Sequence, residues 1–506
     1  MLPSHLIGTF LILTVLSMSS VAPGRPVHVF GPTFVLQTSP QQYMTILPRV
    51  SVESPSPWLI YPTSSTVWVA GITTPPRSEI TEFFMDGTSK EVLNLPNVII
   101  SAILADPKNP SAKVWFTENS TLAFYDTSNL NQVSETKAIT FPNKSIQYLA
   151  NDTYGRIWMS LVGSSEASTI AMYDPSNQMN QTYAVSTGAT IIQGIAVNAP
   201  GDTIWFAEAG SKKIGRLILG QPPDFFSAPA YVNLAAPIQV AVDVAGNVWF
   251  TDHGNNQFGV FNPQTSLWKV FPIGYCPDNC AVYGLPNAIF VDAKNDIWFS
   301  EHIAGRIARY EPSKGVLTEY FVPGGSAPEI WWAMPGPNNL VWFVAWRLGE
   351  IGYVNASIPV PFSLLNPLAD VVVQRGSSVN IPVRVSSQGS VTLSFGVSPS
   401  TQDQPLQFPA RVYGSSPSNL TLNNNFQTAT FSVSAAWNAT LGPRYVALTA
   451  SDGQVAVSAH VRVVVVEASA PFVALGFSSV IILACFTLYM RRPRKPKIQP
   501  VKKTRR

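Results

Sequence analysis

A short motif, in which tryptophan stands between two apolar residues, recurs seven times between residues 67 and 343 and constrains the fold more than any other feature. Successive tryptophans are 43 to 49 residues apart, the length of one four-stranded propeller blade. They are Trp68, Trp115, Trp158, Trp205, Trp249, Trp298 and Trp342. Seven copies predict seven blades, with one large ring packed between each pair of neighbouring blades.

Other elements keep phase with the tryptophan. An apolar segment, often opened by Pro, precedes it, and a further segment ending in Pro follows, as at residues 317–323. This pattern predicts four short strands per repeat. The seventh repeat has no such last segment before Pro359, whereas residues 43–48 resemble one. We therefore expect the N-terminal segment to complete the last blade and close the ring, which leaves no long open edge.

The tryptophan repeat stops near residue 357, and alternating apolar and polar runs continue to about residue 468. About seven short strands in this length are typical of an immunoglobulin-like or fibronectin-like sandwich. The sequence thus predicts an all-β chain, with a seven-bladed β-propeller at 27–357 and a sandwich stalk at 358–468.

Two apolar segments bracket these domains. Residues 470–490 contain no charge, and the tail 491–506 contains nine basic residues and no acid, which predicts a transmembrane helix with a cytoplasmic tail. Residues 1–26 resemble a signal peptide or an uncleaved N-terminal anchor. We expect a single-pass plasma-membrane protein whose bulk is extracellular. Without the tail, 23 basic and 29 acidic residues remain, so a nucleic-acid partner is not expected.

The region predicted to be extracellular contains two cysteines, Cys276 and Cys280. In an oxidising compartment this pair favours a local disulfide over a metal site. Glycosylation is permitted at seven Asn-x-Ser/Thr sequons, namely Asn119, Asn143, Asn151, Asn180, Asn355, Asn419 and Asn438.

Residues 297–310, with the order Ile-Trp-Phe-Ser-Glu-His-Ile-Ala-Gly-Arg at their start, resemble a blade of the virginiamycin B lyase family. The resemblance extends over roughly residues 45–355 and implies a seven-bladed propeller. It also implies the activity of the founding enzyme, a Mg-dependent elimination that opens a cyclic depsipeptide antibiotic at one mouth of the central channel.

The residues that the resemblance assigns to this chemistry are missing here. In the late blades the family has His after the Pro that opens the inner strand, but this chain has Asn287 and Glu329. The metal-binding Glu positions correspond to Ala327 and to the region of Ala345 and Trp346. No cofactor is therefore predicted, and Mg is expected only if the chain is an enzyme of another design.

Several residues remain as candidates for a site. The acids that follow the tryptophan by three positions, such as Glu118 and Asp252, recur at the same strand end, so we expect them to accept hydrogen bonds from turn amides. Two of them are followed by His, and Glu301 with His302 is retained as an acid–base or metal candidate. Ligand-binding positions at the channel mouth, which differ from blade to blade, are Trp58, Asn97, Gln193, Ile238, Asn287 and Glu329.

The intact repeats and the missing catalytic set favour a cell-surface binding module for a polar ligand, a glycan or a protein partner. One alternative is a lyase or lactonase that uses Glu329, Asn287, Glu301 and His302 at the channel mouth. Another is a structural component of a surface layer. The sequence leaves open whether the chain is an enzyme.

Overall fold

A computed structural model describes residues 42–468, with gaps at 48–55, 74–76, 85–87, 130, 133, 164–166, 187–190, 230–231, 274–283, 325–327, 366–368 and 399–411. The predicted leader, the Cys276–Cys280 disulfide and the predicted membrane span at 470–490 lie outside these residues. Within the described part, no helix is long and apolar enough to cross a membrane.

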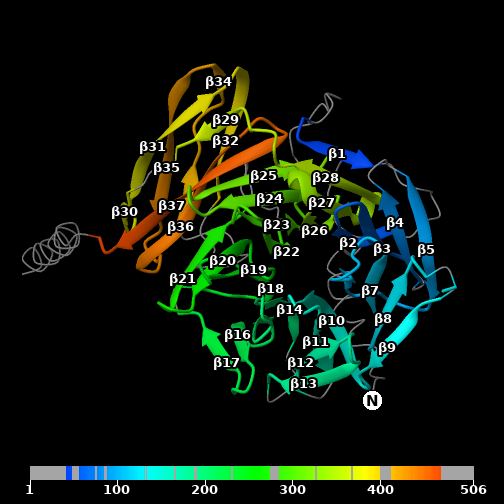
Figure 1. Ribbon diagram of the computed structural model, residues 1–506. Helices are drawn as coiled ribbons and strands as arrows, with labels where there is room; N and C mark the ends of the chain where they lie inside the picture. Colours follow the sequence, from blue (N-terminus) through cyan, green and yellow to red (C-terminus); the bar gives the residue numbers. More distant parts are fainter. Residues whose placement is uncertain are drawn as a thin grey trace, which may run out of the picture.

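Seven sheets of at least four strands stand in a ring, as the repeat predicted (Figure 1). Blade 1 contains β2 (Ser56–Pro62), β3 (Thr66–Thr73), β4 (Arg77–Phe84) and β5 (Ser89–Pro96), and blade 2 contains β6 (Ile103–Ala105), β7 (Lys113–Glu118), β8 (Thr121–Asp126) and β9 (Thr136–Thr140). Blade 3 contains β10 (Lys144–Asn151), β11 (Ile157–Gly163), β12 (Thr169–Asp174) and β13 (Met179–Ala184). Blade 4 contains β14 (Ile192–Val197), β15 (Thr203–Glu208), β16 (Lys213–Ile218) and β17 (Asp224–Ser227).

The remaining blades follow the same order, from an inner to an outer strand. Blade 5 contains β18 (Pro237–Val242), β19 (Val248–Asp252), β20 (Gln257–Asn262) and β21 (Leu267–Pro272). Blade 6 contains β22 (Pro286–Val291), β23 (Ile297–Glu301), β24 (Arg306–Glu311) and β25 (Val316–Phe321). Blade 7 contains β26 (Ile330–Pro335), β27 (Leu340–Ala345) and β28 (Glu350–Asn355), with short 3₁₀ turns η1 (Pro337–Asn339) and η2 (Trp346–Leu348).

The N-terminal strand supplies the fourth strand of blade 7. Strand β1 (Met44–Leu47) pairs antiparallel with β28, and Met44 lies opposite Val354. The preceding residue, Tyr43, accepts a hydrogen bond from the Asn355 amide at 2.8 Å. The predicted closure of the ring is therefore confirmed, and the last blade joins the two ends of the propeller.

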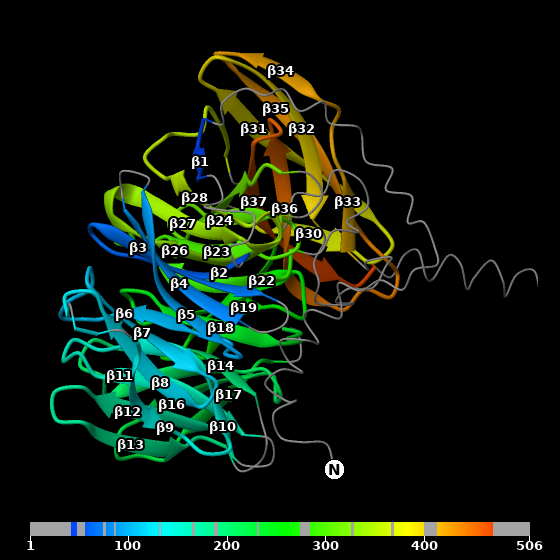
Figure 2. The ribbon, with the colours of Figure 1, turned by 90° about the vertical axis from the view of Figure 1, so that its right-hand side faces the viewer.

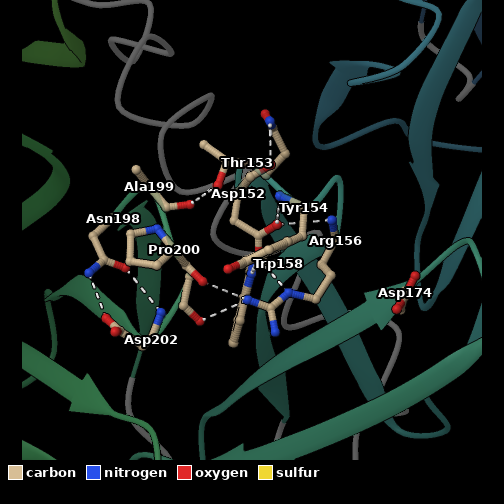
Figure 3. A network of polar contacts seen from close by, with 12 residues as sticks. Asp152, Thr153, Tyr154, Arg156, Trp158, Asp174, Asn198, Ala199, Pro200 and Asp202 are labelled. Atoms are coloured by element: carbon tan, nitrogen blue, oxygen red, sulfur yellow. Dashed lines mark hydrogen bonds and ion pairs between the residues drawn. The ribbon is translucent and has the colours of Figure 1, made fainter.

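The repeat tryptophans are at most 6% exposed, as expected of rings between blades. Several also donate their indole N–H to an Asp in the turn before the strand, which satisfies a buried polar group. These pairs are Trp115–Asp106, Trp158–Asp152, Trp249–Asp243 and Trp298–Asp292, at 2.7 to 2.9 Å. Asp152 also accepts the Arg156 guanidinium at 2.6 Å, and Arg156 reaches the carbonyl of Pro200 in blade 4 (Figure 3). The turn thus ties neighbouring blades together.

Two further sheets follow the propeller and form a C-terminal unit. They contain β29 (Phe362–Leu364), β30 (Val371–Gln374), β31 (Ser378–Ser387), β32 (Ser390–Ser398), β33 (Val412–Ser415), β34 (Leu420–Asn423), β35 (Phe426–Ala435), β36 (Gly442–Ser451) and β37 (Val455–Val466). One sheet has the order β29-β31-β35-β33, and the other contains β37, β36, β32 and β34, with β30 parallel to β37. Phe395 and Phe431 meet between the two sheets, with ring centroids 5.8 Å apart.

One sheet of the C-terminal unit continues that of blade 6. Strand β37 pairs antiparallel with β25, with Val316 opposite Ala459 and Tyr320 opposite Val455. The ring Nε2 of His460, also on β37, donates a hydrogen bond to the carbonyl of Pro272 in blade 5, at 2.8 Å. Both views place the unit, in yellow to orange-red, against the rim of the ring (Figures 1 and 2), and Figure 1 shows it beside β25. Alternation along β37 does not reveal which edge it joins, so this pairing was not predictable.

Candidate functional site

In each blade, the inner strand begins at the same face of the ring at which the next strand ends. In blade 6, Pro286 at the start of β22 lies opposite Glu301 at the end of β23, and in blade 5 Pro237 lies opposite Asp252. We call this the mouth face. The predicted candidates Trp58, Asn287, Glu329 and His302 all lie at these strand ends.

Aromatic rings from four consecutive blades contact one another in series at the mouth face. His253 of blade 5 lies 5.8 Å from His302 of blade 6, with ring planes 21° apart. His302 meets Trp331 of blade 7 edge-on at 4.8 Å. Trp331 stacks on Trp58 of blade 1 at 4.3 Å, and Trp346 contacts the edge of Trp58 at 5.8 Å. We call these five residues the aromatic arc.

The two polar residues at the expected catalytic positions both have hydrogen-bond partners within the protein. The Asn287 side chain, 3% exposed, donates a hydrogen bond to the carbonyl of Trp331 at 2.7 Å. Glu329, 4% exposed, accepts one from the Arg347 guanidinium at 3.1 Å. Arg347 itself is 60% exposed. Both Asn287 and Glu329 are thus engaged within the protein, and the guanidinium is the charged group that reaches solvent.

Other predicted mouth residues lie apart from the arc. Asn97 follows the end of β5, the outer strand of blade 1, because Pro96 ends that strand rather than opening an inner one. The predicted inner-strand position of Asn97 is therefore wrong. Gln193 lies on inner strand β14 of blade 4, where its carbonyl accepts the Ser160 hydroxyl at 2.5 Å. Ile238, on inner strand β18 of blade 5, is buried.

The two histidines of the arc are held neutral. Burial, and then the charge of the neighbouring His253, lower the pKa of His302 to about 3. Burial likewise lowers the pKa of His253 to about 4, against a hydrogen bond to the Pro286 carbonyl that favours the charged form. Because a charged ring buried at this place could not be hydrated, both rings are uncharged at neutral pH.

Glu301 does not join His302, although the two are adjacent in sequence. Its fully buried carboxyl lies within blade 6 beside Glu319 and Arg306, whose Nη1 is 2.9 Å from Glu319 and 3.8 Å from Glu301. Burial, and then the charge of Glu319, raise the pKa of Glu301 well above its usual value. Asp252 does accept hydrogen bonds from turn amides, at Ala235 and Ala236, as the recurrent acids were expected to do.

The described residues at the mouth do not bring together a set of metal ligands. Among the described residues, no three His, Cys, Asp or Glu side chains lie close enough together to hold a metal ion. The carboxyl groups that could contribute to a metal site lie beside arginines instead. Glu329 pairs with Arg347, and Glu301 lies 3.8 Å from Arg306. The residues present therefore do not fit the metal implied by the family resemblance.

Inner-strand side chains of several blades meet around a small cavity. This cavity of about 30 Å³, room for roughly one water molecule, lies among inner-strand residues of several blades. Its lining consists of Leu59, Tyr61, Ala102, Ile103, Tyr148, Leu149, Phe290, Trp332 and Met334. Trp332 contacts both Tyr148 and Phe290, with centroids 5.8 and 6.0 Å apart. This cavity therefore does not hold a ligand larger than water.

Sequence and structure comparisons agree on the kind of propeller. The profile described as "Virginiamycin B lyase family" matches residues 108–364. A solved virginiamycin B lyase from Staphylococcus aureus is 19% identical, with a TM-score of 0.51, and the match covers 62% of this chain and 98% of that chain. A streptogramin B lyase structure is 19% identical, with a TM-score of 0.52, over 62% and 97% of the two chains.

A third similar structure holds a catalytically inactive virginiamycin B lyase from Staphylococcus aureus with quinupristin. It is 20% identical, with a TM-score of 0.52, and the match covers 62% of this chain and 98% of that chain. No curated protein matches the chain. At these identities the three structures support the fold.

Proposed function

This chain belongs to the virginiamycin B lyase family, and we propose that it acts as a ligand-binding propeller at a cell surface rather than as an antibiotic lyase. The observation that carries the proposal is the aromatic arc, which spans blades 5, 6, 7 and 1 where the family's chemistry is expected. Asn287 and Glu329 support it, because each stabilises the arc or its neighbour Arg347 instead of facing a reactant.

The proposed ligand is a polar molecule, a glycan or a segment of a protein partner. Trp331 and Trp346 are partly exposed, and Arg347 extends beside them. Partly exposed indole rings offer a flat apolar surface with a polar edge, and a guanidinium adds directed hydrogen-bond donors. This combination suits a ligand with both flat faces and hydroxyl or carboxyl groups.

We further propose that the propeller is displayed outside the cell by a single C-terminal anchor. Residues 1–26 would direct export, 470–490 would span the membrane, and the basic tail 491–506 would remain in the cytoplasm. The two sheets at 358–468 would act as an immunoglobulin-like connection between propeller and anchor. The absence of charge at 470–490 and the run of basic residues after it support this arrangement.

Binding can be tested with the purified full-length chain in detergent, probed on an array of defined glycans. The parent chain should bind a subset of the glycans. The binding signal of Trp331→Ala on those glycans should be at least tenfold lower. Tyr154→Ala is the matched control, because Tyr154 is an exposed aromatic residue at the opposite face of blade 3. Equal retention by the parent and Trp331→Ala would contradict a binding site at the arc.

The lyase alternative is tested with quinupristin and Mg²⁺. We expect chromatography to recover the compound unchanged after incubation with the parent chain. A ring-opened product that disappears in Glu329→Gln would instead establish catalysis at the mouth and replace the binding proposal.

A further inference from the structure

Three exposed apolar side chains lie near the end of β37, from which the chain continues toward residue 470. They are Trp437 and Leu441 in the loop between β35 and β36, and Val372 on β30, and we call them the apolar patch. Their exposed fractions are 70%, 41% and 57%. Exposed apolar side chains of this size gain free energy when an apolar partner covers them.

The loop is fixed to the end of β37. Arg375 donates to the carbonyl of Ala439 at 2.7 Å and to the carboxylate of Glu467 at 2.8 Å, while its amide donates to the carbonyl of Val466 at 3.0 Å. One arginine therefore joins the Trp437 loop to the last described residues of the chain. It also neutralises Glu467 close to the patch.

Trp437 is held against the backbone rather than left to move freely. A Cβ atom added at Gly376 would come within 2.2 Å of the indole Cε2, so the ring lies directly on this glycine. Gly376 has a φ of +71°, and its amide donates to the carbonyl of Ala435 at 2.8 Å. The glycine thus provides both the turn and the flat surface on which the indole ring rests.

The position of the patch identifies its partner. Ala470 begins the uncharged segment and lies three positions after Glu467, which is a reach of about 10 Å at most. Tryptophan is enriched where proteins meet lipid headgroups, because its ring is apolar and its N–H is polar. Arginine near a membrane places its stem along apolar groups and its charge among the headgroups.

We propose that Trp437, Leu441 and Val372 form a lipid-contacting foot that seats the C-terminal unit on the outer headgroup layer. The proposal rests on the membrane anchoring proposed above. The foot and the anchor then contact the membrane through adjacent segments. Because β37 pairs with β25, the same sheet fixes the position of blade 6 relative to the membrane.

The test uses the full-length chain reconstituted in vesicles of phosphatidylcholine, either unmodified or brominated near the headgroup. Bromine quenches tryptophan fluorescence on contact. Trp437 is one of 13 tryptophans, so the parent should lose about one part in thirteen of its emission, and Trp437→Phe should lose much less. Trp346→Phe is the control and should be quenched like the parent.

Flotation of the vesicles after an alkaline wash separates the two proposals. A chain that does not float with the vesicles refutes the anchor. A chain that floats, but whose quenching is the same in the parent and in Trp437→Phe, overturns the foot and leaves the anchor standing. A glycan found on Asn438, the residue after Trp437, would also overturn the foot, because it would hold the loop in water.

Discussion

The ring of Trp58 in blade 1 lies stacked on the ring of Trp331 in blade 7, with centroids 4.3 Å apart and planes 18° apart. This contact crosses the seam of the propeller, because blade 7 is completed by β1 and precedes blade 1 in the ring. One stacked pair therefore belongs both to the closure of the fold and to the aromatic arc at the mouth.

Replacing Trp58 with Ala should destabilise the chain by about 3 to 5 kcal/mol, since a ring that is 4% exposed is lost from a packed site. Trp58→Phe should cost less, because part of the ring contact remains. Urea unfolding measures both. Leu267→Ala, which removes an exposed side chain on β21, is the control and should change stability by no more than about 0.5 kcal/mol. A similar cost for the two alanine variants would show that the stack contributes little.

Asp243 should be important for stability although it lies far from the arc. It accepts the indole N–H of Trp249 at 2.9 Å and the amides of Ala245 and Asn247. Asp243→Ala leaves these donors without that acceptor and should cost about 1 to 3 kcal/mol. Asp224→Ala removes a carboxylate from an exposed pair with Arg216 and should cost no more than about 1 kcal/mol. Thermal unfolding of both variants checks the order, and the reverse order would contradict it.

Tyr43 offers a test of ring closure that separates its hydroxyl from its ring. The hydroxyl is buried without a hydrogen-bond partner in the described part of the chain, and the ring packs on the edge of Tyr320. Tyr43→Phe should therefore be neutral or stabilising, whereas Tyr43→Ala should cost roughly 3 kcal/mol. Tyr43→Ala should also expose the N-terminal segment to protease. Resistance of that variant to cleavage would show that β1 does not depend on this ring.

Acid should weaken the fold through the histidines of the arc. Their pKa values in the folded state, about 4 for His253 and about 3 for His302, lie below the value of about 6.5 expected in an unfolded chain. The unfolded state then binds protons first, so stability falls as pH decreases from about 6.5 toward 3. Urea midpoints at pH 7 and pH 5 should differ less for His302→Phe than for the parent. An equal difference would place the acid sensitivity elsewhere.

Glu301 should make the fold less stable as the pH rises, the opposite of the effect of the two histidines. Its folded-state pKa is raised by burial and by Glu319, so its contribution is present at low pH and is lost as pH rises through the raised value. Glu301→Gln keeps the shape without the titration and should gain stability relative to the parent as the pH rises above the usual titration range of Glu. Glu91→Gln, on exposed strand β5, is the control. A parent and a Glu301→Gln variant with parallel pH profiles would exclude a proton on this carboxyl.

The periodic part of the fold was predictable because each blade repeats its own hydrophobic pattern. The tryptophan spacing indicated seven blades, and the resemblance of residues 43–48 to a fourth strand indicated the closure at β28. The Asp that binds the indole N–H was missed, although Asp152, Asp243 and Asp292 each stand six positions before their tryptophan. That spacing was a usable signal.

The candidate site was less predictable, because its contacts join different repeats. Position in the repeat was the basis for selecting Trp58, Asn287, Glu329 and His302. Nothing in the sequence indicated that Trp331 contacts three of them, namely Trp58, Asn287 and His302. Asn97 was misplaced because a Pro opens some inner strands and ends some outer ones. The pairing of β37 with β25 depends on which strand edges meet, and the alternating pattern of β37 is compatible with many edges.

Strand β37 also determines how a mechanical load would pass through the molecule. It pairs with β25 over five residues at its start and with β36 over ten residues along its length, and it ends one residue before Glu467. A pull on a ligand held by the propeller, resisted at the C-terminal end, would act along the strand and stress these hydrogen bonds together rather than one after another. Such a shear geometry resists rupture. The pairing of β37 with β25 would therefore keep the two units together under such a load.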